Sequence, residues 1–160
     1  MSTETRSNGN VRFLSAEDEE ILGEVDPESI TPEVRIHSMN PVHLGLIANA
    51  DGSSQVTGIC EDTVYIQLRV KEKQIVDARF QVRGCGFTIA CGNAACTYVT
   101  GKRLAAALNL DGGTIDQILG GLPKGHRHCA DLAAKAMQAA AKDVLANARD
   151  PWKRTYGANH

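Results

Sequence analysis

The chain has 160 residues, of which 42% are hydrophobic, 22% charged and 4% aromatic, and its formal net charge is −2. This length suits one domain with a buried core, and no apolar stretch is long enough to span a membrane. The few aromatic residues and the lack of a clustered Lys/Arg stripe argue against a nucleic-acid platform.

The N-terminal part of the sequence is acidic, whereas the rest is mildly basic. Residues 1–33 carry a net charge of −7 and residues 34–160 carry +5. An acidic run without apolar residues is typical of a solvated tail, although a docking role stays open, and no apolar signal segment is visible. We assign residues 1–30 to an acidic, disordered tail, 31–149 to one domain and 150–160 to a C-terminal tail, in a cytoplasmic protein.

The first half of the domain predicts one short helix and then strands. Thr31 and Pro32 are typical of a helix start, and the helix over 32–38 should end before Asn40-Pro41. Apolar and polar residues alternate over 64–71 and again over 76–83, with Val76, Ala78, Phe80 and Val82 on the apolar side. This period of two predicts an antiparallel hairpin that turns at Glu72-Lys73, and residues 55–59 should add a third strand.

The second half of the domain predicts helices, over 88–100, 102–109, 114–119 and 128–147. The last of these has a broad apolar stripe at helical spacing. Strands followed by helices predict an α+β fold, a small three-stranded antiparallel sheet with helices packed on one face and water on the other.

Three of the five cysteines lie where one predicted element ends and another begins. Cys60 lies in a turn between two strands, Cys85 at the junction of a strand and a helix, and Cys129 at the start of the last helix. Free N–H groups and the helix dipole at such starts favour the thiolate, which is the form that binds metal. Asp62 and His128 add an oxygen and a nitrogen ligand nearby. Three thiolates with Asp or His could hold an iron–sulfur unit or zinc.

The remaining cysteines and two histidines favour structural roles. In a regular helix Cys91 and Cys96 lie about 9 and 16 Å along the axis from Cys85, too far to share a compact site with it. We expect both to pack in the core, as single cysteines usually do. His37 and His43 are expected to be surface or capping groups.

Several segments of this sequence resemble the IscU/NifU-type iron–sulfur cluster scaffold family. The resemblance spans about 32–145. Its segments are Asn40-Pro41 with Gly45, Cys60-Glu61-Asp62, Ile75-Val76-Asp77-Ala78-Arg79-Phe80, Gly84-Cys85-Gly86-Phe87-Thr88-Ile89-Ala90, Gly101-Lys102, Gly121-Leu122-Pro123 and His128-Cys129.

The resemblance implies a scaffold or carrier protein and not an enzyme. Such a scaffold takes persulfide sulfur from a cysteine desulfurase, takes up iron, builds a labile 2Fe-2S cluster and passes it to apo-proteins. It implies Cys60, Cys85 and Cys129 as cluster ligands, with Cys129 as sulfur acceptor. Asp62 and His128 match the family's further metal-binding positions. A homodimer around the cluster and zinc in the apo form are both compatible with it, and neither nucleic acid nor membrane is an expected partner.

The sequence also departs from that family. Glu61 stands where the family usually has glycine, and Cys91 where many members have serine. Leu122-Pro123-Lys124 begins differently from the Leu-Pro-Pro-Val-Lys segment that an Hsp70-type chaperone reads, which speaks against that partner. The long insertion of the zinc-bound SufU branch between Gly101 and Leu122 is absent, so the pattern favours a stand-alone NifU-like scaffold.

Three other functions use the same residues. A zinc-binding sulfur acceptor would stimulate a cysteine desulfurase without building a cluster. A cysteine-nucleophile enzyme would pair Cys129 with His128, although adjacent helical residues rarely face each other. A pure interaction module would follow if Glu61 disables the site.

Overall fold

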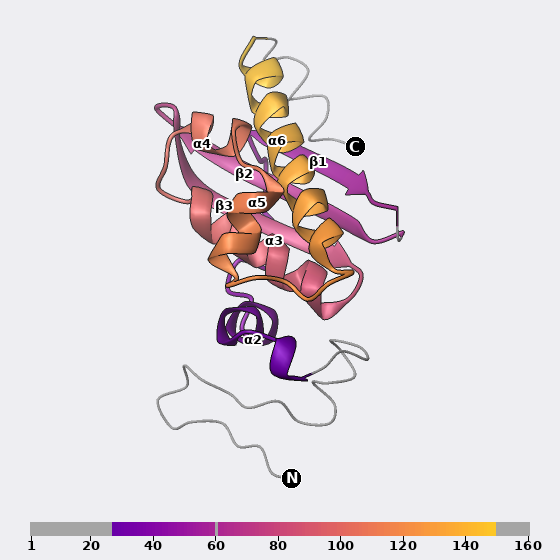
Figure 1. Ribbon diagram of the computed structural model, residues 1–160. Helices are drawn as coiled ribbons and strands as arrows, with labels where there is room; N and C mark the ends of the chain where they lie inside the picture. Colours follow the sequence, from indigo (N-terminus) through magenta and orange to yellow (C-terminus); the bar gives the residue numbers. More distant parts are fainter. Residues whose placement is uncertain (1–26, 60, 150–160) are drawn as a thin grey trace.

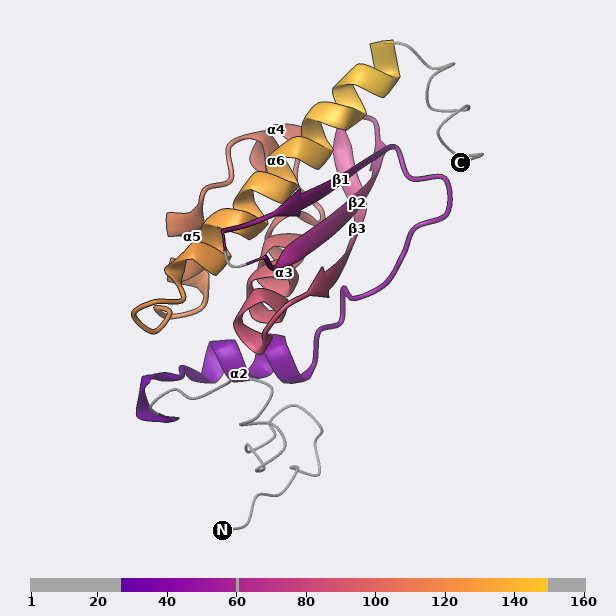
Figure 2. The same cartoon turned by 90° about the vertical axis from the view of Figure 1, so that its right-hand side faces the viewer.

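The computed structural model describes residues 27–59 and 61–149, which form one sheet with helices on one of its faces (Figures 1 and 2). The sheet has three antiparallel strands in the order β1-β2-β3, so the predicted α+β class is confirmed. Its strands are β1 (Gly52–Thr57), β2 (Thr63–Lys71) and β3 (Gln74–Arg83). The helices are the 3-10 turn η1 (Pro27–Ser29), α2 (Pro32–Met39), α3 (Gly86–Val99), α4 (Leu104–Leu108), α5 (Gly112–Ile118) and α6 (Arg127–Arg149).

The hairpin of β2 and β3 turns as predicted but contains a bulge. Glu72 and Lys73 have positive φ angles of 53° and 66°, as a tight two-residue hairpin turn requires. The pairing shifts where Val70 faces Ile75, and Val76 becomes an extra residue without a partner. Ile75 is therefore fully buried and Val76 is 47% exposed. The prediction that Val76 lies on the apolar face was wrong, because the bulge reverses the alternation at this end of β3.

Helices α3 and α6 cover the apolar face of the sheet. In α3 the helix approaches β3 closely at Gly92, where a Cβ atom would lie 2.7 Å from the Phe80 ring. In α6 the predicted apolar stripe is confirmed, and it crosses β1 and β2 (Figure 1). Small side chains at these crossings let the backbones pack at close range.

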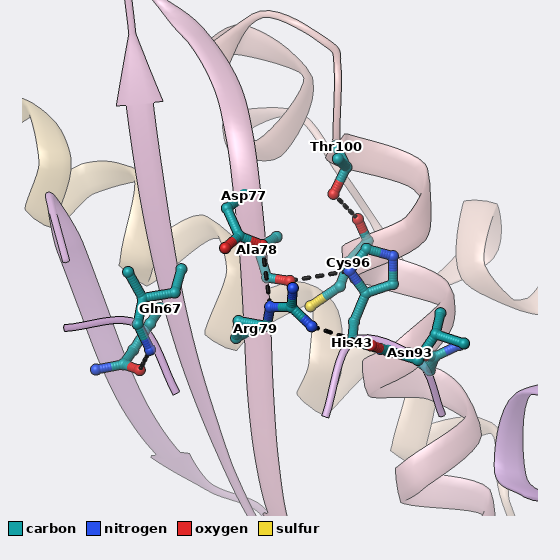
Figure 3. Close-up of polar contacts among 10 residues, drawn as sticks. His43, Gln67, Asp77, Ala78, Arg79, Asn93, Cys96 and Thr100 are labelled. Atoms are coloured by element: carbon teal, nitrogen blue, oxygen red, sulfur yellow. Dashed lines mark hydrogen bonds and ion pairs between the residues drawn. The ribbon is translucent and has the colours of Figure 1, made fainter. Parts of the chain in front are cut away.

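The segment over 40–51 crosses the other face of the sheet, which the sequence analysis left to water. The backbones of His43 and Gly45 bond Phe80 on the edge strand β3, and Ile47 N–H donates to the outward-facing Gln67 side chain. Asn93 of α3 accepts from His43 N–H, and the His43 ring lies 3.0 Å from the Ala78 carbonyl oxygen (Figure 3). The outer face is therefore partly covered by chain, and His43 fixes that covering segment.

Helix α2 packs against α3 at one end of the sheet (Figure 2). The Thr31 side chain accepts from Val34 N–H, which confirms the predicted helix start. His37 bonds the buried Asn93 side chain at 2.8 Å, so this histidine has a structural role. The predicted tails lie largely outside the described residues, and Ile30, assigned to the first of them, is buried in the core. In the part of the chain that the structure describes, no helix combines the length and apolar character needed to cross a membrane.

Candidate metal and sulfur site

Two helix N-termini meet at the candidate site. Cys85 is the N-cap of α3, and its carbonyl accepts from Thr88 N–H and Ile89 N–H. Cys129 lies in the first turn of α6, where its N–H donates to the carbonyl of His126. The unpaired N–H groups and dipoles of both helices thus favour negative charge on the two sulfurs.

Cys85, His126 and Cys129, which we call the thiol cluster, offer three ligand atoms within 4.8 Å of one another. Cys129 is buried and Cys85 is half-buried. Two sulfurs and an imidazole nitrogen at this separation are a donor set that suits zinc or iron. The cluster is the only group of its kind among the described residues.

Thr88 links the thiol cluster to Asp62. Its hydroxyl donates to Asp62 Oδ2 at 2.6 Å and lies 3.5 Å from each of the two cysteine sulfurs. Gly84 makes this possible, because a Cβ there would come within 2.7 Å of the Asp62 carboxylate. Asp62 therefore lies beside the cluster in the described structure, held by a fully buried hydroxyl.

The two cysteines of the cluster share one proton. A hydrogen bond from the Cys129 thiol, supported by Thr88 and backbone N–H groups and opposed by burial, lowers the pKa of Cys85 to about 5. The Cys85 thiolate and burial together raise the pKa of Cys129 well above its usual range. Near neutral pH the metal-free cluster therefore holds a thiolate at Cys85 and a thiol at Cys129.

Cys60 lies outside the described residues, so its predicted place in the site stays a prediction. The residues on either side of Cys60 are held by contacts with the rest of the domain. Gly58 N–H donates to the Asp62 carbonyl, and a Cβ at Gly58 would lie 3.2 Å from Leu132, which is in the second turn of α6. Glu61 has a φ of 65°, a conformation that favours glycine.

The structure brings a different histidine to the two sulfurs from the one predicted from the sequence. His128, predicted as a ligand, has Nε2 3.7 Å from Cys129 Sγ but is not part of the compact cluster. His126, which was not predicted as a ligand, is part of the compact cluster. The signal was available: His126 precedes Cys129 by three positions, directly before the start of α6, and residues three apart at a helix start lie on the same side.

Cys91 and Cys96 are fully buried among apolar side chains, which confirms their prediction as packing residues. Burial is the main cause that raises the pKa of each thiol above its usual range. Neither belongs to the thiol cluster. The chemistry open to the site is thus metal binding and sulfur attack by Cys85 and Cys129.

Comparison with known proteins gives one consistent family. The sequence matches the NifU-like N terminal domain family over residues 30–150. It is 38% identical over 110 residues to the iron-sulfur cluster assembly scaffold protein IscU 1 of Archaeoglobus fulgidus, covering 68% of this chain and 72% of that protein. Identity to the corresponding IscU of Aquifex aeolicus is 35% over 112 residues, covering 68% and 71%.

The fold has solved counterparts. The N-terminal part of a NifU-like protein from Brucella abortus superposes with a TM-score of 0.57 at 16% identity, covering 71% of this chain and 92% of that one. At that identity the likeness concerns the fold alone, and the sequence relatives carry the assignment. The chain belongs to the family of NifU-like N-terminal domains.

Proposed function

We propose that this protein is a scaffold that assembles a labile 2Fe-2S cluster and transfers it to apo-proteins. The observation that carries the proposal is that ligand atoms of Cys85, His126 and Cys129 lie within 4.8 Å of one another, with Asp62 beside them. Thiolates are the usual protein ligands of such clusters. We infer that the chain acts as a carrier and not as an enzyme with turnover of its own.

The proposed cluster ligands are Cys60, Cys85 and Cys129, with Asp62 or His128 as the fourth. Sulfur would come from a cysteine desulfurase as a persulfide. A thiolate attacks the terminal sulfur, a new S–S bond forms, and the donor cysteine leaves as a thiolate. We propose Cys129 as the final acceptor by its family position, although the shared proton leaves Cys85 as the stronger nucleophile of the metal-free pair.

Anaerobic reconstitution tests the scaffold function. Metal-free protein supplied with ferric iron and sulfide should become coloured and contain iron and sulfide in equal amounts. Cys85→Ser should lose this colour, and Cys96→Ala, which removes a buried thiol outside the cluster, should keep it.

Metal analysis of protein purified without oxygen separates the scaffold from the zinc-binding sulfur acceptor. A colourless protein that holds zinc and cannot be reconstituted would contradict cluster assembly and support the acceptor function. Zinc present before reconstitution and displaced by the cluster would agree with the scaffold.

A further inference from the structure

We propose that His126 is a metal ligand of this protein and that Cys85, His126 and Cys129 bind a single divalent ion before any cluster forms. The proposal rests on the scaffold function above and adds to it the site at which iron first arrives. It differs from the proposed cluster ligands because it uses His126 and needs neither Cys60 nor His128.

The first argument is the separation of the ligand atoms. One ring nitrogen of His126 and the two sulfurs lie within 4.8 Å of one another. Sulfur and nitrogen ligands of one tetrahedral zinc ion lie about 2.3 and 2.0–2.1 Å from the metal, which places them about 3.5–4 Å apart. Small side-chain movements are therefore enough to bring the cluster onto an ion.

The second argument is that the imidazole is already held in place. The ring of His126 packs on Phe87, with 4.2 Å between ring centroids, and Phe87 is fully buried. The backbone of His126 is fixed on both sides, by the Pro123 carbonyl and by Cys129 N–H. A ligand held by packing loses little freedom when it binds a metal ion.

The third argument is a polar atom without a partner. Nδ1 of His126 is buried and has no hydrogen-bond partner among the described residues. Buried polar groups are nearly always paired, and an unpaired one marks strain or a ligand that is missing. A metal ion bound at Nδ1 would give this atom the partner that the described residues do not supply.

His128 fits the role less well. Its Nε2 is 3.7 Å from Cys129 Sγ, but the ring is not close to both sulfurs. The His128 ring stacks beside the His126 ring with 6.3 Å between centroids, and it is the His126 ring that packs on Phe87. His128 is therefore placed to contact one sulfur, and His126 to complete the set.

The donor set also predicts the kind of ion. Two thiolates and one imidazole suit Zn(II), Fe(II) or the probe ion Co(II), and disfavour Mg(II) and Ca(II), which prefer oxygen. Three protein ligands leave a fourth position open in a four-coordinate ion. That open position could receive sulfur in a scaffold.

Metal titration of the full-length, metal-free protein tests the proposal. The Kd for Zn(II), measured by competition with a coloured chelator, should rise at least tenfold in His126→Phe, which keeps an aromatic ring against Phe87 and removes the nitrogen. Loss of groups that only orient a metal ligand costs about 10–100-fold in affinity, so loss of a ligand should cost no less. His128→Phe should change the Kd by less than about threefold. The reverse order, or no change in either variant, would overturn the proposal.

A second measurement keeps the test independent of variant folding. In wild-type protein, nitrogen-15 shifts of the imidazole rings report metal ligation directly. One equivalent of Zn(II) should move a ring nitrogen of His126 far more than those of His128. Shifts confined to His128 would contradict the proposal. If His126 is not a ligand and wild-type protein still builds a cluster, the scaffold function stands and only this inference fails.

Discussion

The charge of the thiol cluster depends on which of its two cysteines holds their shared proton. The hydrogen bond between Cys85 and Cys129 places the thiolate at Cys85, and Thr88 adds further hydrogen bonds to it. Because only a thiolate attacks sulfur or carbon electrophiles, reactivity reports this arrangement directly.

We predict that iodoacetamide modifies Cys85 in the metal-free protein already at pH 6.5. Its folded pKa of about 5 lies below the ordinary 9.0, so the thiolate is nearly complete at that pH and the rate should be flat from pH 6.5 to 8. Alkylation rates across this range, assigned to residues by peptide mass spectrometry, provide the measurement.

The hydroxyl of Thr88 provides the control for this reactivity. Thr88→Val should move the midpoint of Cys85 alkylation upward, and Thr88→Ser should leave it near the wild-type value, because only the valine removes the polar hydroxyl that lies 3.5 Å from Cys85 Sγ and lowers its pKa. A wild-type rate that rises about tenfold per pH unit up to pH 8 would show an ordinary thiol and contradict the prediction.

Asp62 is predicted to shorten the life of the cluster. Its carboxylate is a hard, exchangeable ligand beside the sulfurs, so Asp62→Ala should lengthen the half-life of the reconstituted cluster severalfold in air or with a chelator. Decay of the visible absorbance measures this. Glu61→Gln is the matched control, since it removes a neighbouring charge in the same turn. Equal half-lives for wild type and Asp62→Ala would make Asp62 a bystander.

Among the elements, the position of α6 on β1 depends on one glycine. A Cβ at Gly52 would lie 2.4 Å from a Val144 methyl and 2.5 Å from the Ala140 carbonyl. A backbone atom cannot move aside as a flexible side chain can, so strand and helix must separate. This contact helps to hold α6, whose first turn carries Cys129, against the sheet.

Gly52→Ala should therefore lower the free energy of unfolding by about 1–3 kcal/mol. The matched control is Gly113→Ala in α5, where the new Cβ meets nothing nearer than 3.5 Å. That change should be neutral or stabilise by about 0.5–1 kcal/mol, because alanine favours helix. Urea denaturation of both variants measures the difference, and an unchanged Gly52→Ala protein would show that β1 and α6 adjust freely.

In the whole molecule, α2 and the segment over 40–51 are joined to the core through Asn93. Its side chain bonds His37 of α2 and the backbone of His43, and it is buried in α3. Burial, and then the nearby His43, lower the pKa of His37 from its ordinary 6.5, while Glu33 opposes the shift. The unfolded chain therefore binds a proton at His37 at a pH where the folded chain does not.

The free energy of unfolding should therefore decrease as the pH falls below 6.5. The contribution of neutral His37 is complete above pH 6.5 and is lost as the pH falls toward the lowered folded pKa. The urea midpoint should drop more between pH 8 and 5.5 in wild type than in His37→Gln, which cannot titrate but can still accept from Asn93. The same drop in both proteins would assign the pH dependence to other groups.

Much of the fold follows from local patterns. Alternation over 64–71 and the apolar stripe of the last helix are properties of consecutive residues, since burial repeats with the period of the element that contains them. The same holds for Cys85 and Cys129 at helix starts, because glycine, capping and the end of a strand are visible in sequence. These features alone predict the α+β class and a site built on two helix N-termini.

Other features depend on which elements meet. The bulge that exposes Val76 requires the partner strand, and the cover of the outer face by 40–51 requires the edge at Phe80. Thr88 gains its role only when Asp62 and two sulfurs surround it, and His126 only when α6 brings it against Phe87 and Cys85. Residue order determined the elements and the reactive groups at their ends, because propensity and period act over a few residues. Tertiary packing alone decided which of those groups share a site, because distance in space is set by contacts between segments far apart in the chain.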